Sequence, residues 1–195
     1  TMKKFVVIGN PIEHSLSPTL HNYWIKSNGI DAIYEKQKLD EGELEQIILQ
    51  IRKKKIDGVN VTVPFKKVII PFLDELSVEA ENTQSVNTLY LKDNKVIGHN
   101  TDIFGFETSM EISEYNVFNK EVLILGAGGV VPSIIFALNK MKASKIKISN
   151  RTKRKAENLK KLFKDIEIKE WGEVPNFDMI INATSLGLKK EDNLN

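Results

Sequence analysis

The stretch Val122-Leu-Ile-Leu-Gly-Ala-Gly-Gly129 decides the fold of the second half of the chain. It is a short apolar run that ends in a glycine-rich turn, and a helical pattern over 131–141 follows. A strand, such a turn and a helix build the phosphate-binding part of a dinucleotide site. Gly126 and Gly128 take the first two glycine positions of that motif, whereas Val131 stands at the third. A tight turn without a ligand is the alternative interpretation.

The rest of this half repeats strand and helix patterns, which favours a parallel sheet with right-handed crossovers. We expect strands at 122–125, 146–149, 166–169 and 179–181, with a helix over 153–163. The second of these strands ends at Ser149, and just after such a strand an NAD site usually offers a carboxylate to the ribose hydroxyls. The sequence offers Arg151, Arg154 and Lys155 instead. These cations can bind a 2′-phosphate, so the pattern favours NADP over NAD.

The first hundred residues also alternate between strand and helix patterns. Strands are expected at 4–8, 32–38 and 58–63, with a hairpin of 86–91 and 95–97 around Asp93-Asn94. A helix is expected to start at Ser17-Pro18, with Ser17 as its cap. Further helices are expected over 44–51, 65–73, 76–82 and 103–114, with an interruption at Pro71. We place a domain boundary near Ile103, giving domains 1–103 and 104–195.

Two polar segments follow apolar runs of the first domain, Asn60-Val-Thr-Val-Pro-Phe-Lys66 and Asn100-Thr-Asp102. Each provides a charged side chain with amide and hydroxyl neighbours, which suits proton transfer on a small polyhydroxy ligand. Taken alone, Lys66 would be a solvated lysine beside Lys67, and Asp102 a helix N-cap. A proton site and a nucleotide site on one chain favour hydride transfer.

Composition narrows the function further. The 195 residues are 41% apolar with a net charge of +2, so neither nucleic acid nor an anionic membrane is an expected partner. The absence of cysteine excludes disulfides and thiolate chemistry. No apolar run approaches the roughly 18 residues of a membrane span, and we expect a cytoplasmic protein. His14, His21 and His99 lack metal-ligand spacing, so no metal is expected. A homodimer is compatible with the sequence.

Several motifs occur together in one order, from Gly9–Pro18 through Asn60–Lys66, Ser85–Thr88 and Gly98–Asp102 to Asn150-Arg-Thr152. With them the chain resembles the shikimate dehydrogenase family from about Phe5 to Gly187. The resemblance implies an α/β fold, with an N-terminal α/β substrate domain and a Rossmann-like NADP-binding domain. It also implies reduction of 3-dehydroshikimate to shikimate with NADPH, a reversible step of aromatic amino-acid biosynthesis.

The resemblance also implies roles for individual residues. Ser15 and Ser17 would bind the substrate carboxylate, and Lys66 and Asp102 would hold the ring hydroxyls as the catalytic pair. The other substrate-binding residues would be Asn60, Thr62, Asn87 and Thr101. The cofactor-binding residues would be Gly126, Ala127, Gly128, Gly129, Asn150, Arg151, Thr152, Arg154, Lys155 and Thr184.

The family pattern continues past Asn195, so we expect a nucleotide domain that is C-terminally incomplete relative to the family. Two rival functions remain open from the sequence. One is a quinate/shikimate dehydrogenase that uses NAD. The other is a non-catalytic shikimate-binding sensor of the same fold.

Overall fold

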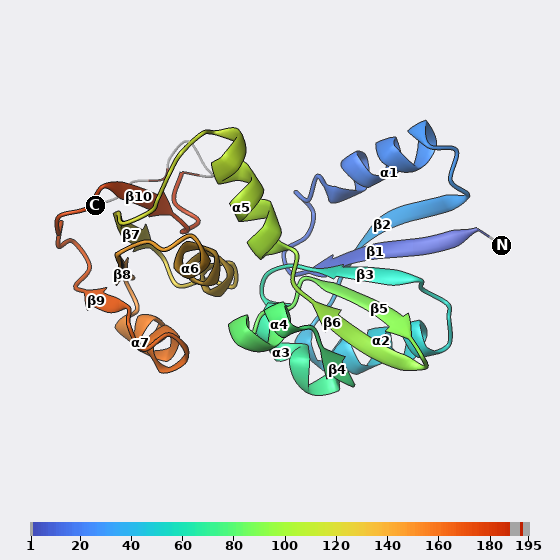
Figure 1. Ribbon diagram of the computed structural model, residues 1–195. Coiled ribbons are helices and arrows are strands. Elements are labelled where there is room, and N and C mark those ends of the chain that lie inside the picture. Colours follow the sequence, from blue (N-terminus) through green and yellow to red (C-terminus); the bar gives the residue numbers. More distant parts are fainter. Residues whose placement is uncertain (1, 188–191, 193–195) are drawn as a thin grey trace. The chain divides into compact units, whose positions relative to one another are not determined.

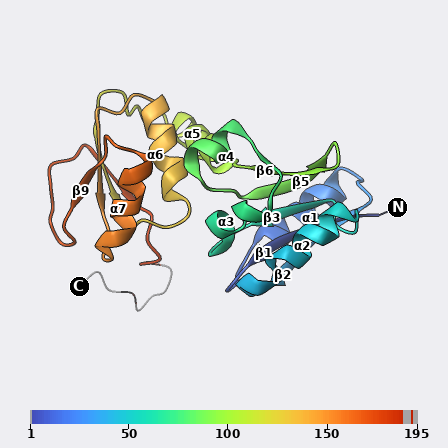
Figure 2. The same ribbon diagram turned by 90° about the horizontal axis from the view of Figure 1, so that it is seen from below.

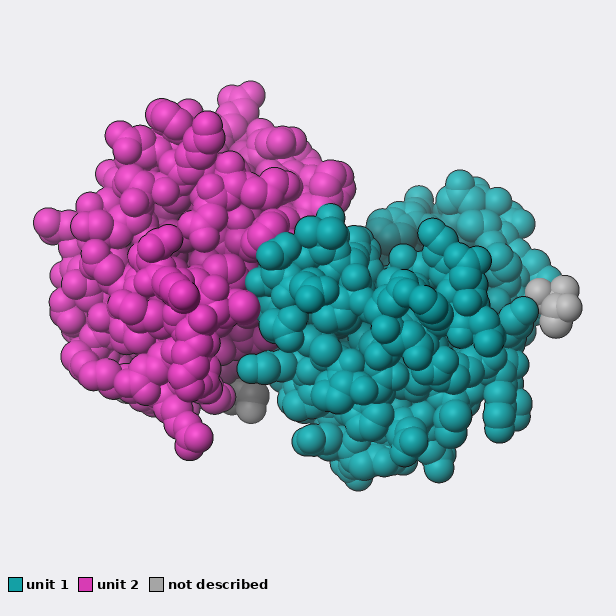
Figure 3. All heavy atoms as spheres, turned by 60° about the horizontal axis from the view of Figure 1, so that its bottom comes forward, with its two compact units in different colours: residues 1–101 teal, residues 102–195 magenta. Residues whose placement is uncertain are grey.

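The computed structural model describes residues 2–187 and residue 192. It divides into two compact units, residues 1–101 and 102–195, which Figure 3 colours separately. The division falls directly before Asp102, so one predicted catalytic residue opens the second unit and the other, Lys66, belongs to the first.

The first unit is built on a six-stranded mixed sheet with the order β2-β1-β3-β5-β6-β4. Its strands are β1 (Lys3–Gly9), β2 (Ala32–Lys38), β3 (Gly58–Val61), β4 (Glu75–Leu76), β5 (Thr88–Lys92) and β6 (Lys95–His99). β1 runs parallel to β2 and β3, whereas β5 runs antiparallel to β3 and β6. The carboxyl ends of β1 and β3 therefore meet at one edge of the sheet, and the start of β5 lies beside them.

Helices cover both faces of this sheet. They are α1 (Ser17–Ser27), α2 (Leu44–Arg52), α3 (Phe65–Val68) and α4 (Val78–Thr83), with the short 3₁₀ turns η1 (Glu41–Glu43) and η2 (Ile70–Phe72). Figure 1 shows α1 on one face and α2, α3 and α4 on the other. The apolar side of α2 (Leu44, Ile47, Ile48 and Ile51) is buried against the sheet, as its helical spacing predicts. The larger core of the first unit therefore lies on the α2 face.

Several local predictions for the first unit are wrong. The helix predicted over 65–73 is divided into α3 and η2 before Pro71 instead of at it, and β5 begins at Thr88 instead of residue 86. The strand predicted to reach Val63 ends at Val61. Leu76 pairs with β6 as part of β4 instead of starting a helix, and α4 begins after Ser77, whose hydroxyl accepts the Ala80 N–H at 3.2 Å. Ser17 does not cap α1, because it is the first residue of the helix and Leu16 holds the N-cap position, without a side-chain cap.

The second unit is a four-stranded parallel sheet with the order β10-β7-β8-β9, which confirms the predicted parallel arrangement. The strands are β7 (Glu121–Leu125), β8 (Lys145–Ser149), β9 (Glu167–Lys169) and β10 (Met179–Asn182). The helices are α5 (Asp102–Ile112), α6 (Val131–Lys140) and α7 (Lys153–Leu162). Buried residues of all three helices share one core with β7 and β8, and Figure 2 shows α5 beside α6.

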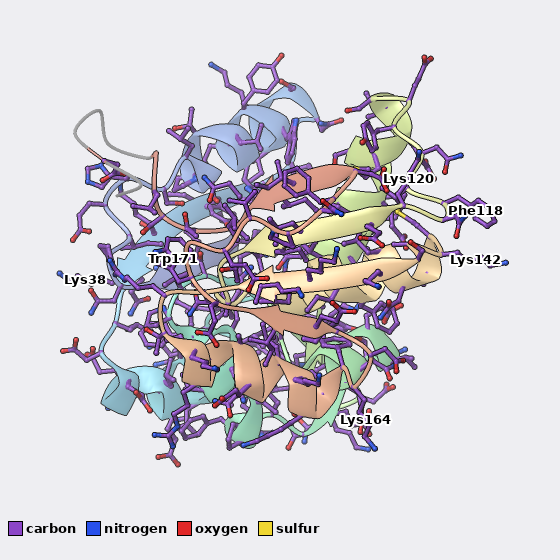
Figure 4. The ribbon with its side chains drawn as sticks, turned by 90° about the vertical axis from the view of Figure 1, so that its left-hand side faces the viewer. Lys38, Phe118, Lys120, Lys142, Lys164 and Trp171 are labelled. Atoms are coloured by element: carbon purple, nitrogen blue, oxygen red, sulfur yellow. The ribbon has the colours of Figure 1, made fainter. Side chains whose placement is uncertain are left out.

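The strand order reverses between β10 and β7. In open α/β sheets ligands bind outside the carboxyl ends of the strands at such a switch point. Gly126 follows β7 at this point, and Ala183 follows β10. Figure 4 shows the two ends of the sheet, with Trp171 at the carboxyl end and Phe118, Lys120 and Lys142 at the opposite end.

Candidate active site

Asn87 joins the two polar segments of the first unit. The side-chain nitrogen of Asn87 donates to the Thr101 hydroxyl at 2.8 Å, and its side-chain oxygen accepts the Thr101 N–H at 3.0 Å. The N–H of the preceding Val86 donates to the carbonyl of Lys66 at 2.8 Å. Residues 86 and 87 are therefore hydrogen-bonded both to the backbone of Lys66 and to Thr101, the residue before Asp102.

A buried residue lies close to each of the two charged groups in the sequence, whereas the charged groups themselves are partly exposed. Phe65, next to Lys66, is 2% exposed and anchors α3 in the core. Asn100 is also 2% exposed, and its side-chain amide donates to the Ser85 carbonyl at 2.9 Å. Buried neighbours thus anchor the backbone near Lys66 and Asp102, while both side chains are partly exposed.

Asn60 lies at the centre of a further hydrogen-bond network. Its amide nitrogen donates to the Asn87 carbonyl and to the Thr88 hydroxyl, both at 3.2 Å. Its amide oxygen accepts the Tyr34 hydroxyl at 2.7 Å. Because both ends of this amide are occupied, its orientation is determined, and Asn60 and Asn87 form one connected set.

Tyr34 is a site residue that sequence reasoning missed, because it was one aromatic residue in a predicted strand with no motif around it. The residue is 4% exposed. The Asn22 side chain pairs with its backbone, accepting the Tyr34 N–H at 3.0 Å and donating to its carbonyl at 2.8 Å. The His21 ring stacks on the Tyr34 ring at 4.1 Å. Helix α1 therefore fixes the edge strand β2 at Tyr34.

Burial raises the pKa of Tyr34 from 10.0 to about 12, against a smaller lowering by its hydrogen bond with the Ser17 side chain. The protonated phenol is thus favoured in the folded state. Its contribution to stability is fully present below pH 10 and is lost as the pH rises towards 12. We expect Tyr34→Phe to remove this loss, so the free energy of unfolding should fall less steeply between pH 10 and 12 than in the unmodified chain.

Urea unfolding at a series of pH values measures that difference. Tyr90→Phe is the matched control, because Tyr90 is 38% exposed. The control variant should keep the slope of the unmodified chain. If the free energy of unfolding fell equally steeply with pH in Tyr34→Phe and in the unmodified chain, the raised pKa of Tyr34 would be contradicted.

The two predicted carboxylate-binding serines and Thr62 lie near the end of β1. The Ser15 N–H donates to the Ile12 carbonyl at 3.1 Å, which places the loop after β1 in a turn. The Thr62 N–H donates to the Ile8 carbonyl at 2.9 Å. A Cβ added to Gly9 would lie 2.6 Å from the Thr62 methyl carbon, so only glycine fits between the two loops.

In the second unit, Gly126 lies where three strand ends meet. Its N–H donates to the Ser149 carbonyl at 2.8 Å, and the Ala183 N–H donates to the Leu125 carbonyl at 2.8 Å. Gly126 has a φ of +111°, and a Cβ there would lie 2.7 Å from the Ala183 carbonyl oxygen. Both the backbone conformation and the available space require glycine at this position.

Gly128 and Val131, the other two positions of the glycine motif, have different surroundings. A Cβ on Gly128 would meet no atom of the described residues within 4 Å, so its backbone is accessible to a ligand. Val131 is fully buried and contributes to the core, where the motif expects its third glycine. The missing glycine thus does not alter the accessible part of the turn.

The segment after β8 presents its cations to solvent. The Asn150 amide donates to the Thr152 carbonyl at 2.8 Å and closes the turn, while Arg151, Arg154 and Lys155 are exposed. Across the switch point, the Thr184 N–H and hydroxyl both donate to the Asn182 side-chain oxygen, at 3.0 and 2.7 Å. Both predicted cofactor segments therefore follow strands at the carboxyl edge of this sheet.

The described part of the chain holds neither a metal-binding cluster nor a membrane-spanning helix. Residues 2–187 and 192 contain no group of three or more histidine and carboxylate residues that could hold a metal ion. None of the helices over the same residues is long and apolar enough to cross a membrane.

Comparisons with known proteins follow the same division of the chain. Residues 7–89 match the shikimate dehydrogenase substrate binding domain, and residues 108–188 match the shikimate / quinate 5-dehydrogenase family. The shikimate dehydrogenase (NADP(+)) of Pelagibacter ubique (strain HTCC1062) is 66% identical over 193 residues, covering 99% of this chain and 73% of that protein. The protein of the same name from Caldicellulosiruptor saccharolyticus is 39% identical, covering 96% and 70%.

Solved structures agree with these matches. The shikimate dehydrogenase of Aquifex aeolicus superimposes with a TM-score of 0.88 at 38% identity, over 98% of this chain and 72% of that chain. The shikimate 5-dehydrogenase of Thermus thermophilus, solved in complex with NADP(H) and shikimate, superimposes with a TM-score of 0.86 at 30% identity, over 96% and 70%. Both halves of the sequence match this family, the solved structures share its fold, and the chain belongs to the shikimate dehydrogenase family.

Proposed function

We propose that this protein is an NADP-dependent shikimate dehydrogenase, which reduces 3-dehydroshikimate to shikimate with NADPH in a reversible step of aromatic amino-acid biosynthesis. The observation that carries the proposal is the 66% identity to a shikimate dehydrogenase (NADP(+)) over 193 residues. Residues 1–103 would hold the substrate, and residues 104–195 would hold NADP.

In the first domain, the hydroxyls of Ser15 and Ser17 would bind the carboxylate of the substrate. Asn60, Thr62, Asn87 and Thr101 would contact the ligand or support the residues that do. The hydrogen bonds between Asn60, Asn87 and Tyr34 support this assignment, because they fix the amide groups before a ligand arrives. A site fixed in this way loses less conformational entropy on binding.

Reduction of a ring ketone requires a hydride on carbon and a proton on oxygen. NADPH supplies the hydride when it is bound. The Lys66 ammonium would hydrogen-bond the carbonyl oxygen, stabilise its developing negative charge and deliver the proton. Asp102 would hold a ring hydroxyl of the substrate and act with Lys66 in the proton transfer. In the reverse direction the same pair would accept the proton of the alcohol.

The residues of the second domain fit the proposed cofactor. The exposed backbone at Gly128 can approach a pyrophosphate, and Thr184 lies on the other side of the switch point. Arg151, Arg154 and Lys155 are exposed cations suited to a 2′-phosphate. Asn150 and Thr152 shape the turn that carries these cations.

Initial-rate measurements with shikimate or quinate, each with NADP⁺ or NAD⁺, test the proposal. We expect turnover of shikimate with NADP⁺, at a kcat/KM at least about tenfold above that with NAD⁺. A preference for NAD⁺ and quinate would support the rival dehydrogenase. Calorimetric binding of shikimate without any cofactor reduction would support the sensor. A homodimer and a cytoplasmic location remain predictions from the sequence.

A further inference from the structure

An ion pair lies beside the proposed 2′-phosphate site. Lys153, the first residue of α7, donates from its ammonium to the Glu170 carboxylate. Glu170 directly follows β9, and its carbonyl accepts the Ser149 hydroxyl at 3.2 Å. Since Ser149 pairs with Lys169 in the sheet, Glu170 lies alongside the loop that starts at Asn150. Figure 4 shows the next residue, Trp171, at this carboxyl end of the sheet.

The Glu170 carboxylate has the wrong sign for a site that binds a dianionic phosphate. The sequence from Ser149 to Lys155 contains no carboxylate, so Glu170 brings a negative charge to a region that is otherwise cationic. Its side chain is 68% exposed and therefore faces solvent, through which a phosphate would approach. An unpaired carboxylate there would repel a 2′-phosphate and could accept the hydroxyls of an unphosphorylated ribose.

The other charged side chains described next to Glu170 do not neutralise its carboxylate. Glu173 accepts the Glu170 N–H at 3.3 Å and adds a second carboxylate. Lys169 pairs with Glu167 and Glu173, at 3.6 and 3.9 Å. The hydrogen bond with Glu170 is the largest of several influences that raise the pKa of Lys153, so the ammonium keeps its proton.

We propose that Lys153 is a specificity-determining residue for the cofactor, which neutralises Glu170 and thereby keeps the 2′-phosphate site cationic. The inference rests on the NADP site proposed above and deepens it. Arg151, Arg154 and Lys155 attract the phosphate directly, whereas Lys153 acts through Glu170. Loss of Lys153 alone should then shift the preference towards NAD, and loss of both members of the pair should not.

Calorimetric titration with 2′,5′-ADP and with 5′-AMP isolates the contribution of the 2′-phosphate, because the two ligands differ only in that group. We expect Lys153→Met to weaken 2′,5′-ADP binding about tenfold and to leave 5′-AMP binding unchanged, since screening limits the repulsion by one exposed carboxylate. Glu170→Gln should bind 2′,5′-ADP at least as tightly as the unmodified chain. The double variant should recover the original affinity to within about twofold.

Lys160→Met is the matched control, because it removes an exposed lysine from the same helix. This control should leave the binding of both ligands unchanged. A double variant as weak as Lys153→Met would overturn the inference, because Lys153 would then contact the phosphate itself. Equal affinities in all variants would overturn it as well. If the unmodified chain bound both ligands equally, the proposed NADP site would fail together with the inference. If the unmodified chain preferred 2′,5′-ADP but the variants did not behave as predicted, only the inference would fail.

Discussion

Replacement of Lys66 by alanine is expected to lower kcat for shikimate oxidation by about a thousandfold, the range of a lost general acid–base group and charge stabiliser. The Kd for shikimate should rise by less than about tenfold, because Lys66 acts mainly on the charge that develops during the reaction. The α3 backbone should stay in place, since the buried Phe65 side chain and the hydrogen bond from Val86 hold it independently of the lysine. Steady-state rates and calorimetric Kd values measure the two effects separately.

Lys67→Ala is the control for this variant. Lys67 is the next residue on α3, carries the same charge and is exposed. Its loss should leave kcat within about twofold, since the charge of an exposed side chain is largely screened by solvent and salt. A Lys66→Ala variant with a nearly normal kcat would exclude Lys66 from the chemistry. Equal losses in both variants would indicate a general charge effect.

The second large effect is expected at the glycine turn, where two glycines should fail in different ways. In Gly126→Ala the new Cβ would overlap the Ala183 carbonyl at a φ of +111°. We expect a loss of about 2–4 kcal/mol in the free energy of unfolding, typical of strained backbone combined with overpacking. Gly128→Ala should unfold within about 1 kcal/mol of the unmodified chain, because its Cβ has open space.

Cofactor binding should separate the same two variants. Gly128→Ala should weaken NADP binding at least about tenfold, since the methyl group stands where the pyrophosphate must approach the backbone. Urea unfolding and calorimetric NADP titration on the same samples measure both quantities. A destabilised Gly128→Ala, or one that binds NADP normally, would contradict the proposed division of roles between the two glycines.

The sequence was most informative where a periodic pattern and local chemistry agreed. The strand 32–38 was predicted with both of its ends. The hairpin around Asp93-Asn94 is confirmed, because both residues have positive φ, as a two-residue turn of this kind requires. The predictions failed where tertiary contacts dominate. Leu76 continues an apolar pattern that fits a helix, yet pairing with Gly98 places it in β4.

The arrangement of the candidate site was less accessible from the sequence. Motifs indicated Asn60 and Asn87 as separate candidates, but only the fold shows that their amides are hydrogen-bonded. Tyr34 lies 26 positions from its partner Asn60 and belongs to no motif. Contacts between residues so distant in the sequence depend on strand order, which local patterns do not encode.

The most direct test of the account is a double-mutant cycle in kcat with Lys66→Ala, Asp102→Ala and the variant that carries both changes. If one proton-transferring unit contains both groups, each single change should cost about a thousandfold, and the combined change should cost little more than the larger single loss. Losses that multiply across the cycle, or a single variant that turns over shikimate at the normal rate, would contradict the account.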